Sequence, residues 1–410
     1  MFAKLSKEQK FILWVLALIN FFNYIDRQVI FPLFHNIQMT FHVSDAALGF
    51  LGTVFMLVHS LTSVPLGVLA DKYSRKAIIA GGVAFWSIAT FASGLAGSFR
   101  ALLGIRSAVG VGEASYAPAA TAMISDNFPQ GVRAQAQGFF SVGMFAGGTI
   151  GAMIGGIVAY QYNWRYAFFI VAIPGIILAL LATKITEKKK EHNQPKIALI
   201  DLLTNRALFW VMISGVFASF AVGGYVSWGV EFIRRYKHYN IEQASIILGL
   251  TMLAAGLLGV FIGSYVADYM QRRMAAGRAF TIGMALVLAA PLMFLGVSRH
   301  AGPLFLFYLF AGTVLLSVYQ APAVAVIHDI VPKHMRATSY AFYLLVVHLF
   351  GDTPAPAVVG KLSDLYSLRF GLELMTFFVF LGGLAFFISG YYIETGKSKI
   401  YIDAEEIVST

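Results

Sequence analysis

The sequence contains no cysteine and few charged residues. None of its 410 residues is Cys, and Asp, Glu, Lys and Arg together make up 12%, whereas 58% are hydrophobic. Without thiols, a disulfide framework, thiolate catalysis and a cysteine metal site are excluded. Soluble domains carry about 25% charged residues, so a chain this apolar is not a water-soluble enzyme. The 15% aromatic content also excludes a disordered chain.

The sequence instead contains long apolar runs, and these runs predict membrane-spanning helices. The runs 11–34 and 77–98 are each long enough to cross a bilayer, which takes about 20 residues. Reading every run between its flanking charges and turn residues predicts an all-α membrane protein with 12 transmembrane helices. The predicted spans are 11–34, 46–70, 77–98, 101–125, 134–160, 164–183, 207–231, 243–267, 279–297, 303–328, 337–360 and 371–393.

One long polar connection divides the predicted helices into two groups of six. Residues 184–206 contain Pro195 and five lysines, which is typical of a solvated linker. We therefore expect an N-terminal six-helix bundle over 1–183, a cytoplasmic basic linker over 184–206, a C-terminal six-helix bundle over 207–394 and a cytoplasmic tail over 395–410.

The distribution of basic residues predicts the orientation in the membrane. With the N-terminus inside, most of the 30 Lys and Arg residues fall in cytoplasmic segments, as the positive-inside rule requires, and Arg234, Arg235 and Lys237 form the one cluster against it. We expect a multi-pass protein of the cytoplasmic (inner) membrane with both termini inside. The same bias accounts for the net charge of +10. The expected partner from this charge distribution is therefore the lipid bilayer, with no nucleic acid.

Two pairs of loops indicate that the halves of the chain repeat. Ala70–Lys76 is similar to Ala267–Arg273, and Asp126–Ala134 is similar to Asp329–Ala337. Each pair is separated by about 200 residues, which is typical of two parallel repeats related by an axis along the membrane normal. The sequence thus predicts two parallel six-helix repeats.

Twelve helices in two parallel repeats joined by a basic linker resemble the major facilitator superfamily. The loop Gly67–Lys76 is similar to that superfamily's motif between helices 2 and 3. The resemblance covers nearly the whole chain and implies alternating access, in which two bundles rock about a midplane site. It also implies that Gly67, Asp71 and Arg75 belong to a cytoplasmic gate, in which Asp71 caps a helix across the bundle interface and Arg133 is its candidate partner. Loop charge that only sets the topology is the alternative.

Four ionisable residues lie inside predicted spans, where charge is costly and often functional. Asp26 and Arg27 lie in the span 11–34, and Arg106 and Glu113 lie on one face of the span 101–125. A carboxylate binds protons more tightly out of water and less tightly beside an arginine. Asp26 and Glu113 are therefore the predicted proton-coupling residues, and Arg27 and Arg106 modulate them or hold an anionic group. The alternative is a static ion-pair network between the two helices.

Other polar and aromatic residues of the predicted spans are candidates for lining a cavity, and His348 with Asp352 is also a candidate second proton site. For each of them, a packed or hydrogen-bonded position in the core is the alternative. The candidates are Asn23, His59, Tyr116, Tyr225, Trp228, Tyr319, Gln320, His348 and Asp352. The sequence shows neither a metal-ligand set nor a catalytic motif in the spans, so we expect no metal, no cofactor and no enzyme activity.

Glycines recur every four residues in the span 134–160, at Gly143, Gly147, Gly151 and Gly155. Small residues at this spacing let helices approach closely. The pattern also resembles the helix 5 motif of exporters in the superfamily, but Gly148 stands where that motif has proline. The direction of transport therefore stays open.

Two branches of the superfamily share the pattern Asn23–Arg27 and the spacing from Arg106 to Glu113. The string Val109–Tyr116, followed by Asp126–Pro129, is more similar to the Spinster-like branch than to the organic anion:proton symporters. The Spinster-like branch includes transporters of lysophospholipids and sphingolipid phosphates. The resemblance implies that the four ionisable residues carry proton coupling and the response to substrate.

We therefore expect a proton-coupled secondary active transporter of an amphiphilic or lipid-like anionic substrate. The resemblance implies that it works by alternating access, as a monomer, on a small-molecule or lipid-like substrate, with the proton gradient as its driving force. An organic anion (sugar acid or carboxylate):proton symporter and a drug or metabolite exporter are the alternatives. The two arginines oppose a cationic substrate if they are unpaired. Substrate identity, direction and the choice between H⁺ and Na⁺ remain open.

Overall fold

The computed structural model describes residues 5–187, 204–332 and 335–396, and every regular element in these ranges is helical. The expected linker and tail lie largely outside the described residues. So do the side chains of a few helical residues, among them Asp71. The first half contains α1 (Lys7–Val29), η2 (Phe31–Leu33), α2 (Phe34–Phe41), α3 (Asp45–Lys72), α4 (Arg75–Gly94), α5 (Phe99–Ala114), α6 (Tyr116–Asn127), α7 (Gln130–Gln161) and α8 (Arg165–Ala182). The second half contains α10 (Arg206–Lys237), α11 (Ile241–Gln271), α12 (Gly277–Ser298), α13 (Pro303–Ser317), α14 (Gln320–Asp329), α15 (Arg336–Val347), η4 (His348–Asp352), α16 (Ala355–Leu365) and α17 (Leu368–Glu394).

Each predicted span has a helix, but four spans are interrupted. The span 11–34 continues past Pro32 into α2, and the span 101–125 divides at Ser115, whose hydroxyl donates to the Gly112 carbonyl at 2.8 Å. The span 303–328 divides between α13 and α14, and the span 337–360 contains the π-helical turn η4. A side-chain hydroxyl that bonds its own backbone competes with the helix ladder, and a π-turn is often found at a functional site.

Ten helices of the described part are long and apolar enough to cross a membrane. The two predicted spans outside this set are 11–34 and 101–125, which contain the four ionisable residues Asp26, Arg27, Arg106 and Glu113. The apolar helices expose large side chains: Leu180 is 65% exposed and Phe261 is 76% exposed. Such surface is stable in lipid rather than in water.

Five of the described helices have a serine as their N-cap. In each case the hydroxyl accepts a hydrogen bond from a backbone N–H of the first turn, which would otherwise lack a partner. The caps are Ser6, Ser44, Ser74, Ser98 and Ser367. These caps place the helix ends in short polar turns between the spans.

The chain forms two compact units. Unit 1 comprises Met1–His192 and Ser227–Leu253, and unit 2 comprises Asn193–Val226 and Ala254–Thr410. Unit 1 thus takes in the end of α10 and the start of α11. The boundaries of the expected bundles, 1–183 and 207–394, stay a prediction.

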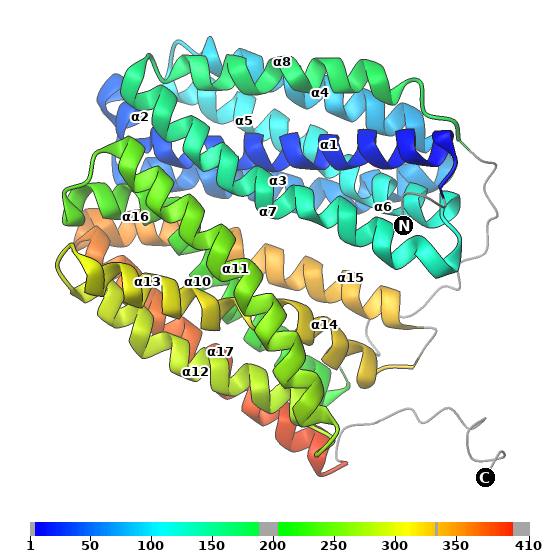
Figure 1. Ribbon diagram of the computed structural model, residues 1–410. Coiled ribbons are helices and arrows are strands. Elements are labelled where there is room, and N and C mark those ends of the chain that lie inside the picture. The colour runs from blue at the N-terminus through cyan, green and yellow to red at the C-terminus, as the bar shows by residue number, and fades with distance from the viewer. Residues whose placement is uncertain (1–4, 188–203, 333–334, 397–410) are drawn as a thin grey trace. The chain divides into compact units, whose positions relative to one another are not determined.

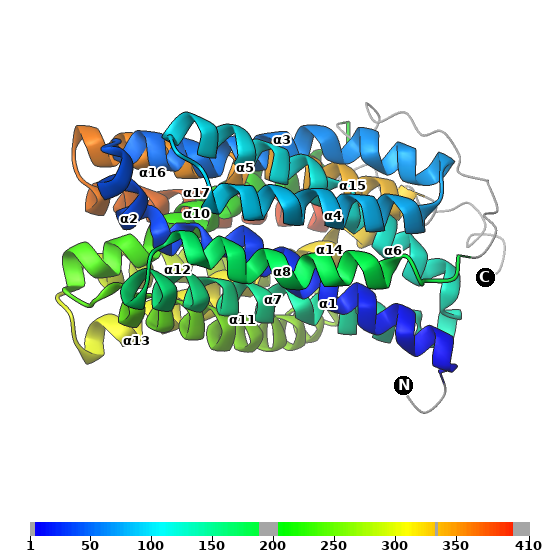
Figure 2. The same cartoon turned by 90° about the horizontal axis from the view of Figure 1, so that it is seen from above.

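Glycine packing organises unit 1, where α1 lies along α7 and α8, and α4 lies along α5 and α8 (Figure 1, Figure 2). A Cβ at Gly147 would lie 2.3 Å from the Phe21 carbonyl oxygen, and one at Gly151 would lie 2.5 Å from that of Ile25. The glycine stripe of α7 therefore lets its backbone contact that of α1.

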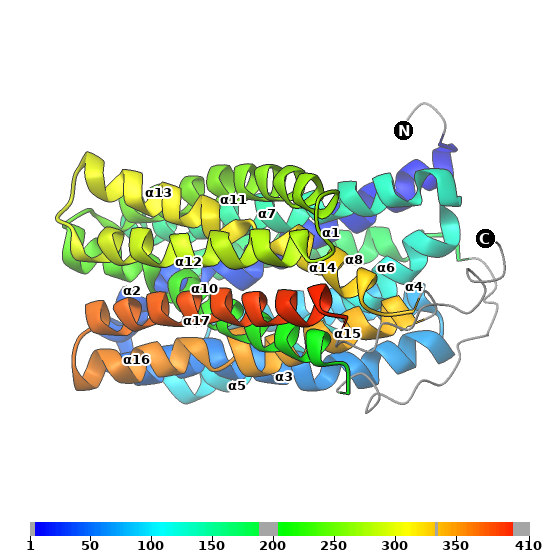
Figure 3. The same cartoon turned by 90° about the horizontal axis from the view of Figure 1, so that it is seen from below.

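Unit 2 contains a similar close approach. Its helix α12 packs along α13 and α17, and α16 packs along α17 (Figure 3). A Cβ at Gly215 of α10 would lie 2.6 Å from the Tyr343 ring of α15, and one at Gly223 would lie 2.9 Å from the Asp352 Cα. Glycines thus pack the first helix of the second half against its fifth, as they do in the first half.

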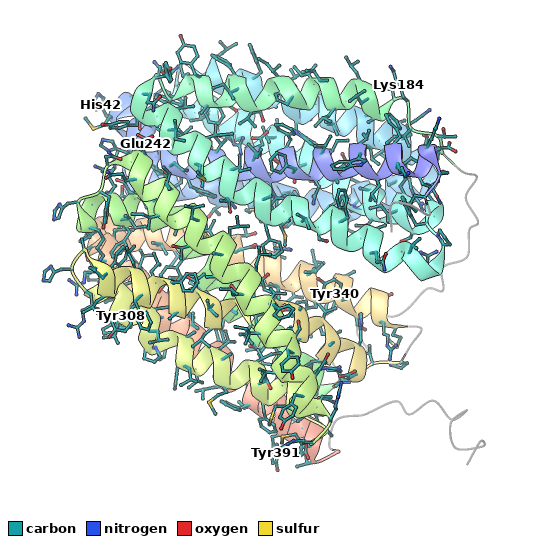
Figure 4. All side chains as sticks on the ribbon, viewed as in Figure 1. His42, Lys184, Glu242, Tyr308, Tyr340 and Tyr391 are labelled. Carbon is teal, nitrogen blue, oxygen red and sulfur yellow. The ribbon has the colours of Figure 1, made fainter. Side chains whose placement is uncertain are left out.

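The two ends of unit 1 differ in the residues that they carry. His42 and Glu242 lie at one end and Lys184 at the other (Figure 4). We call these the distal end and the proximal end. His42 has a positive φ of 52° and precedes the cap Ser44, and His238 has a φ of 59° and precedes the cap Asn240. This shared turn adds a third match between the halves of the chain.

Candidate functional site

The four ionisable residues of the predicted spans form two ion pairs that join α1 and α5 crosswise. Arg106 Nη1 lies 2.7 Å from Asp26 Oδ1, and Arg27 Nη2 lies 3.2 Å from Glu113 Oε2. Each helix contributes one acid and one base, so the cluster is neutral as a whole. The two pairs form the ion-pair network between the helices that the sequence analysis gave as the alternative, and their part in proton coupling stays a prediction.

The Asp26–Arg106 pair is fully enclosed, and its carboxylate is well bonded, whereas Arg106 Nε is buried with no partner among the described residues. Their side chains are 2% and 1% exposed. Asp26 Oδ1 accepts from Arg106, and its Oδ2 accepts from the Thr90 hydroxyl of α4. Arg106 Nη2 also donates to the Asp26 carbonyl oxygen at 3.4 Å. Both carboxylate oxygens of Asp26 therefore have donors.

The Glu113–Arg27 pair is less complete. Glu113 Oε2 accepts from Arg27 Nε at 3.3 Å and from Nη2 at 3.2 Å. Its other oxygen, Oε1, is buried with no hydrogen-bond partner among the described residues. The Arg27 side chain is 14% exposed, whereas that of Glu113 is 0% exposed. Burial of an under-bonded carboxylate disfavours its charged form.

His59 of α3 is the third group at this pair. Arg27 Nη2 donates to His59 Nε2 at 3.1 Å. A guanidinium has no acceptor, so Nε2 accepts and the imidazole is neutral in this arrangement. Arg27 is therefore shared between a carboxylate and an imidazole.

Aromatic rings surround both guanidinium groups. The Phe55 ring centroid lies 5.6 Å from Arg27 Cζ and 5.2 Å from Arg106 Cζ, and the Tyr24 ring lies 5.1 Å from Arg27 Cζ. A cation over a ring face is stabilised by the ring's charge distribution. Neither Thr90 nor Phe55 was predicted as part of the site. The signal for Thr90 in the sequence is a polar residue inside the apolar span 77–98.

Glycines beside Glu113 bring the neighbouring helices to the site. A Cβ at Gly110 would lie 2.7 Å from the Phe55 carbonyl oxygen, and one at Gly112 would lie 2.9 Å from the Trp86 backbone nitrogen. The string Val109–Tyr116 therefore allows α3 and α4 to pack directly on α5. This packing places Phe55 and His59 against the charged cluster.

Three further cavity candidates of unit 1 lie in the packed interior. Asn23 is 4% exposed, and its Nδ2 is buried with no partner among the described residues. The Tyr116 hydroxyl donates to the Leu16 carbonyl oxygen, and the ring packs in the core. Trp228 is 0% exposed and packs edge-on against Phe34 at 5.1 Å. Tyr116 and Trp228 are therefore core residues rather than exposed lining.

The candidates of unit 2 cluster at the interruptions of its helices. Tyr319 and Gln320 are partly buried where α13 gives way to α14. His348 Nδ1 lies 2.8 Å from Asp352 Oδ2, across the π-turn η4, with side chains 40% and 20% exposed. The Tyr225 hydroxyl of α10 donates to the Leu372 carbonyl oxygen at 2.9 Å.

The predicted gate residues lie at the proximal end of unit 1. A Cβ at Gly67 would lie 3.7 Å from Pro118 of α6. Arg75 forms an ion pair with Asp126 at the end of α6. The side chain of Asp71 lies outside the described part, so its helix-capping role stays a prediction.

Arg133 is exposed at the start of α7, and its Nε donates to the Phe128 carbonyl oxygen at 3.3 Å. In the second half Arg336 Nε donates to the His328 carbonyl oxygen at 3.0 Å. Each arginine thus donates to a backbone carbonyl earlier in its own loop, but the two acceptors are not equivalent residues of the loop repeat. A direct pairing of Arg133 with Asp71 stays a prediction.

The second half contains an arginine that the loop comparison missed. Arg278 Nη1 lies 2.5 Å from Asp329, and its Nη2 lies 2.7 Å from Asp268. Arg75 makes the corresponding pair with Asp126 in the first half. The structural counterpart of Arg75 is therefore Arg278, and not the Arg272–Arg273 pair that follows Asp268 in the loop.

No group of three or more His, Asp or Glu side chains in the described part is placed to hold a metal ion. The site therefore offers paired charges, an imidazole and aromatic rings. These groups can exchange protons and bind anions.

The fold and this site belong to a known class of membrane proteins. The family model of the Major Facilitator Superfamily matches residues 16–352. The chain is a member of that superfamily, which confirms the expected all-α fold and multi-pass membrane protein. It also confirms that the chain is a transporter rather than an enzyme.

Within the superfamily the relatives confirm the Spinster-like resemblance. The chain is 28% identical to Protein spinster of Drosophila melanogaster in an alignment of 383 positions that covers 88% of this chain and 63% of the fly protein. It is 26% identical to Protein spinster homolog 1 of Homo sapiens in an alignment of 437 positions that covers 96% of this chain and 83% of the human protein.

Solved structures share the fold. A bacterial homolog of the human lysosomal transporter Spinster, crystallised in an inward-facing and occupied conformation, matches with a TM-score of 0.87 at 24% identity. That match covers 96% of this chain and 99% of the other. The nucleoside transporter NupG matches with a TM-score of 0.75 at 14% identity over 92% of this chain and 98% of its own.

Proposed function

We propose that this protein is a proton-coupled secondary active transporter that works by alternating access on an amphiphilic, lipid-like anion. The observation that carries the proposal is the incomplete pair of Glu113 with Arg27. One Glu113 oxygen is buried without a partner, and Arg27 is the one member of the crosswise cluster with appreciable exposure.

The two ion pairs have different roles in the proposed cycle. Asp26 has donors on both carboxylate oxygens and holds Arg106 in place. Glu113 is the group that takes up the proton, because protonation removes an under-bonded buried charge. A proton on Glu113 releases Arg27 from its carboxylate, and the freed guanidinium then binds the anionic group of the substrate. Proton uptake and anion binding are thereby linked through one arginine.

The surroundings of Arg27 favour an amphiphile. The rings of Tyr24 and Phe55 flank the guanidinium, so an apolar chain and an anionic head both find contacts there. The resemblance to Spinster proteins supports the same substrate class. A sugar acid or other small carboxylate is the second candidate, since it would use Arg27 in the same way. A cationic drug is disfavoured because both carboxylates are already paired with arginine.

The proposal also assigns the orientation of the protein in the membrane. We place the proximal end and both termini in the cytoplasm of a cell with an inner membrane, in accordance with the basic residues. Gly67, Asp71, Arg75 and Arg133 then belong to the cytoplasmic gate. The proton gradient is the driving force, no cofactor is needed, and the monomer is the working unit.

A thermal-shift screen of the purified protein tests the substrate class. The panel is a lysophospholipid, a sphingoid phosphate, a sugar acid, a dicarboxylate and a cationic amphiphile. A ligand that binds the folded state raises the apparent melting temperature by mass action. We expect the two anionic amphiphiles to stabilise the protein, and Arg27→Ala to remove that shift. The exposed Arg100 on the same α5 helix as Arg106 provides the control variant Arg100→Ala.

Other results of the screen would revise the proposal. Stabilisation by the small acids alone would replace the lipid-like substrate with an organic anion. Stabilisation by the cationic amphiphile alone would contradict an arginine-centred anion site.

A further inference from the structure

One nitrogen of Arg27 serves two acceptors at the coupling site. Its Nη2 donates to Glu113 Oε2 at 3.2 Å and to His59 Nε2 at 3.1 Å. The acceptors belong to different helices, Glu113 to α5 and His59 to α3. A terminal guanidinium nitrogen carries two hydrogens, so both bonds can exist at the same time. His59 thus contributes to the geometry of the pair without contributing to its charge balance.

Close packing of α3 on α5 fixes the position of His59. A Cβ at Gly110 of α5 would lie 2.7 Å from the Phe55 carbonyl oxygen and 3.3 Å from the His59 backbone nitrogen. Phe55 lies one turn before His59, and their ring centroids are 6.2 Å apart. The Phe55 centroid also lies 5.6 Å from Arg27 Cζ. This turn of α3 therefore presents a phenyl ring and an imidazole to the Arg27 guanidinium.

Arg27 reaches this turn from a helix whose backbone packs elsewhere. Helix α1 lies along α7 and α8, whereas α3 lies along α5. The contact of Arg27 with His59 is therefore made by a long side chain, which loses conformational freedom when it is fixed. A partner that fixes such a side chain in advance lowers the cost of binding a ligand to it. Glu113 and His59 both do so while Glu113 is charged.

Proton uptake by Glu113 changes the two bonds of Arg27 differently. In the proposed cycle the proton removes the carboxylate charge, so the ion pair is lost. The bond to His59 does not depend on that charge, because a neutral imidazole accepts through the lone pair of Nε2. His59 therefore still holds the guanidinium when Glu113 no longer attracts it. The charge of Arg27 is then available to an anion while its position is kept.

We infer that His59 is a positioning residue, which keeps the Arg27 guanidinium in place once Glu113 is protonated and so presents it to the anionic group of the substrate. This inference rests on the proposed function, in which Arg27 binds that group. Glu113 then carries the proton, and His59 sets the affinity for the substrate. His59 stays neutral in this role, because a protonated imidazole has no acceptor for Arg27.

Unfolding in detergent at alkaline pH tests the link between His59 and Arg27 without a substrate. His59→Phe keeps a ring but removes the acceptor, and Glu113→Gln imitates the protonated carboxyl group. We expect His59→Phe to lower the melting temperature more in the Glu113→Gln background than in the unmodified protein, because Arg27 then has neither the carboxylate nor the imidazole. In the control background Glu8→Gln, which is exposed at the start of α1, the fall should equal that in the unmodified protein.

The conservative variant His59→Gln separates the acceptor from the rest of the side chain. Its amide oxygen can accept from Arg27, so it should restore the melting temperature that His59→Phe loses. Failure to do so would overturn the inference, since the imidazole would then act through its shape or its proton. Equal falls by His59→Phe in the Glu113→Gln and Glu8→Gln backgrounds would overturn it as well, because His59 would then act independently of the Arg27–Glu113 pair.

Binding and flux of a lysophospholipid test the positioning role itself. In a thermal-shift titration His59→Phe should weaken the apparent affinity about tenfold, which is the scale of one hydrogen bond to a charged group, and His59→Gln should leave it nearly unchanged. In proteoliposomes with an imposed pH gradient His59→Phe should raise KM and keep the maximal rate, as a loss of uniform binding does. An unchanged KM with a reduced maximal rate would contradict the positioning role.

The two kinds of measurement separate this role from the proposed function. If no member of the ligand panel stabilises the unmodified protein and none is transported, the proposed function fails. The unfolding comparison still decides whether His59 holds Arg27 when Glu113 has lost its charge.

Discussion

Removal of Arg27 should destabilise the protein chiefly because it leaves Glu113 charged and alone. The Glu113 side chain is 0% exposed, and Arg27 donates both hydrogen bonds that it receives. Breaking a buried ion pair by removing one partner costs about 3–5 kcal/mol, because the other charge stays uncompensated. We therefore expect Arg27→Ala to lower the unfolding free energy by up to this amount at alkaline pH, where Glu113 stays charged, and by less at a pH where Glu113 binds a proton.

The double variant Arg27→Ala/Glu113→Gln separates this cause from lost packing. It has no buried charge to compensate, so it should regain most of the stability that Arg27→Ala loses. Residues in contact give coupling energies of about 0.5–3 kcal/mol in such cycles, and we expect the upper part of that range. The control Arg100→Ala removes an exposed arginine and should leave stability unchanged.

Thermal or denaturant unfolding in detergent measures all the variants under the same conditions. If the effects of Arg27→Ala and Glu113→Gln simply add, the two side chains are not coupled. The crosswise pair would then carry no energetic link between α1 and α5, and the reasoning would be refuted.

Three further outcomes follow from contacts elsewhere. Gly147→Ala should lower the melting temperature by overpacking, at a cost of about 1–3 kcal/mol, because its Cβ would lie 2.3 Å from an α1 carbonyl oxygen; Gly81→Ala, with nothing within 4 Å, should be neutral in the same unfolding assay. Burial, and then Arg234, hold the pKa of His35 below its usual value, against an opposing effect of Glu231. The folded protein therefore loses stability as pH falls below about 6.5, so its melting temperature should fall in acid, and His35→Gln should reduce that fall. Arg278→Gln, which breaks two ion pairs, should lower the melting temperature more than Arg272→Gln, and an equal effect would refute the assigned counterpart of Arg75.

Hydropathy and charge spacing were sufficient to predict the helical spans and the crosswise cluster. Apolar runs predict spans because lipid requires them, whatever the tertiary packing. A pairing between the two helices could be expected because each helix offers one acid and one base in the costly interior, but the sequence did not show that Asp26 meets Arg106 and Glu113 meets Arg27. Both features depend on residues that are close together in the sequence, so a single sequence is enough to recognise them.

Features that depend on three-dimensional approach could not be predicted in this way. Thr90 binds Asp26 from α4, and Arg278 of α12 binds Asp329, which lies 51 residues later in the sequence. Nothing in the local pattern distinguishes Tyr116, whose hydroxyl bonds a backbone carbonyl in the core, from a tyrosine that lines a cavity. The ion pair of Arg235 with Asp45 could not be predicted either, because the two residues lie far apart in the sequence.

Proton coupling through Glu113 is tested most directly by flux in proteoliposomes under an imposed pH gradient. The probes are a labelled lysophospholipid and a labelled sugar acid, each with the unmodified protein, Glu113→Gln and the control Glu8→Gln, whose side chain is exposed at the start of α1. We expect the gradient to drive flux of the lysophospholipid in the unmodified protein and in Glu8→Gln. Glu113→Gln should remain folded and monodisperse but should not respond to the gradient. Gradient-driven flux through Glu113→Gln at the unmodified rate would contradict the assignment of the proton to this carboxylate.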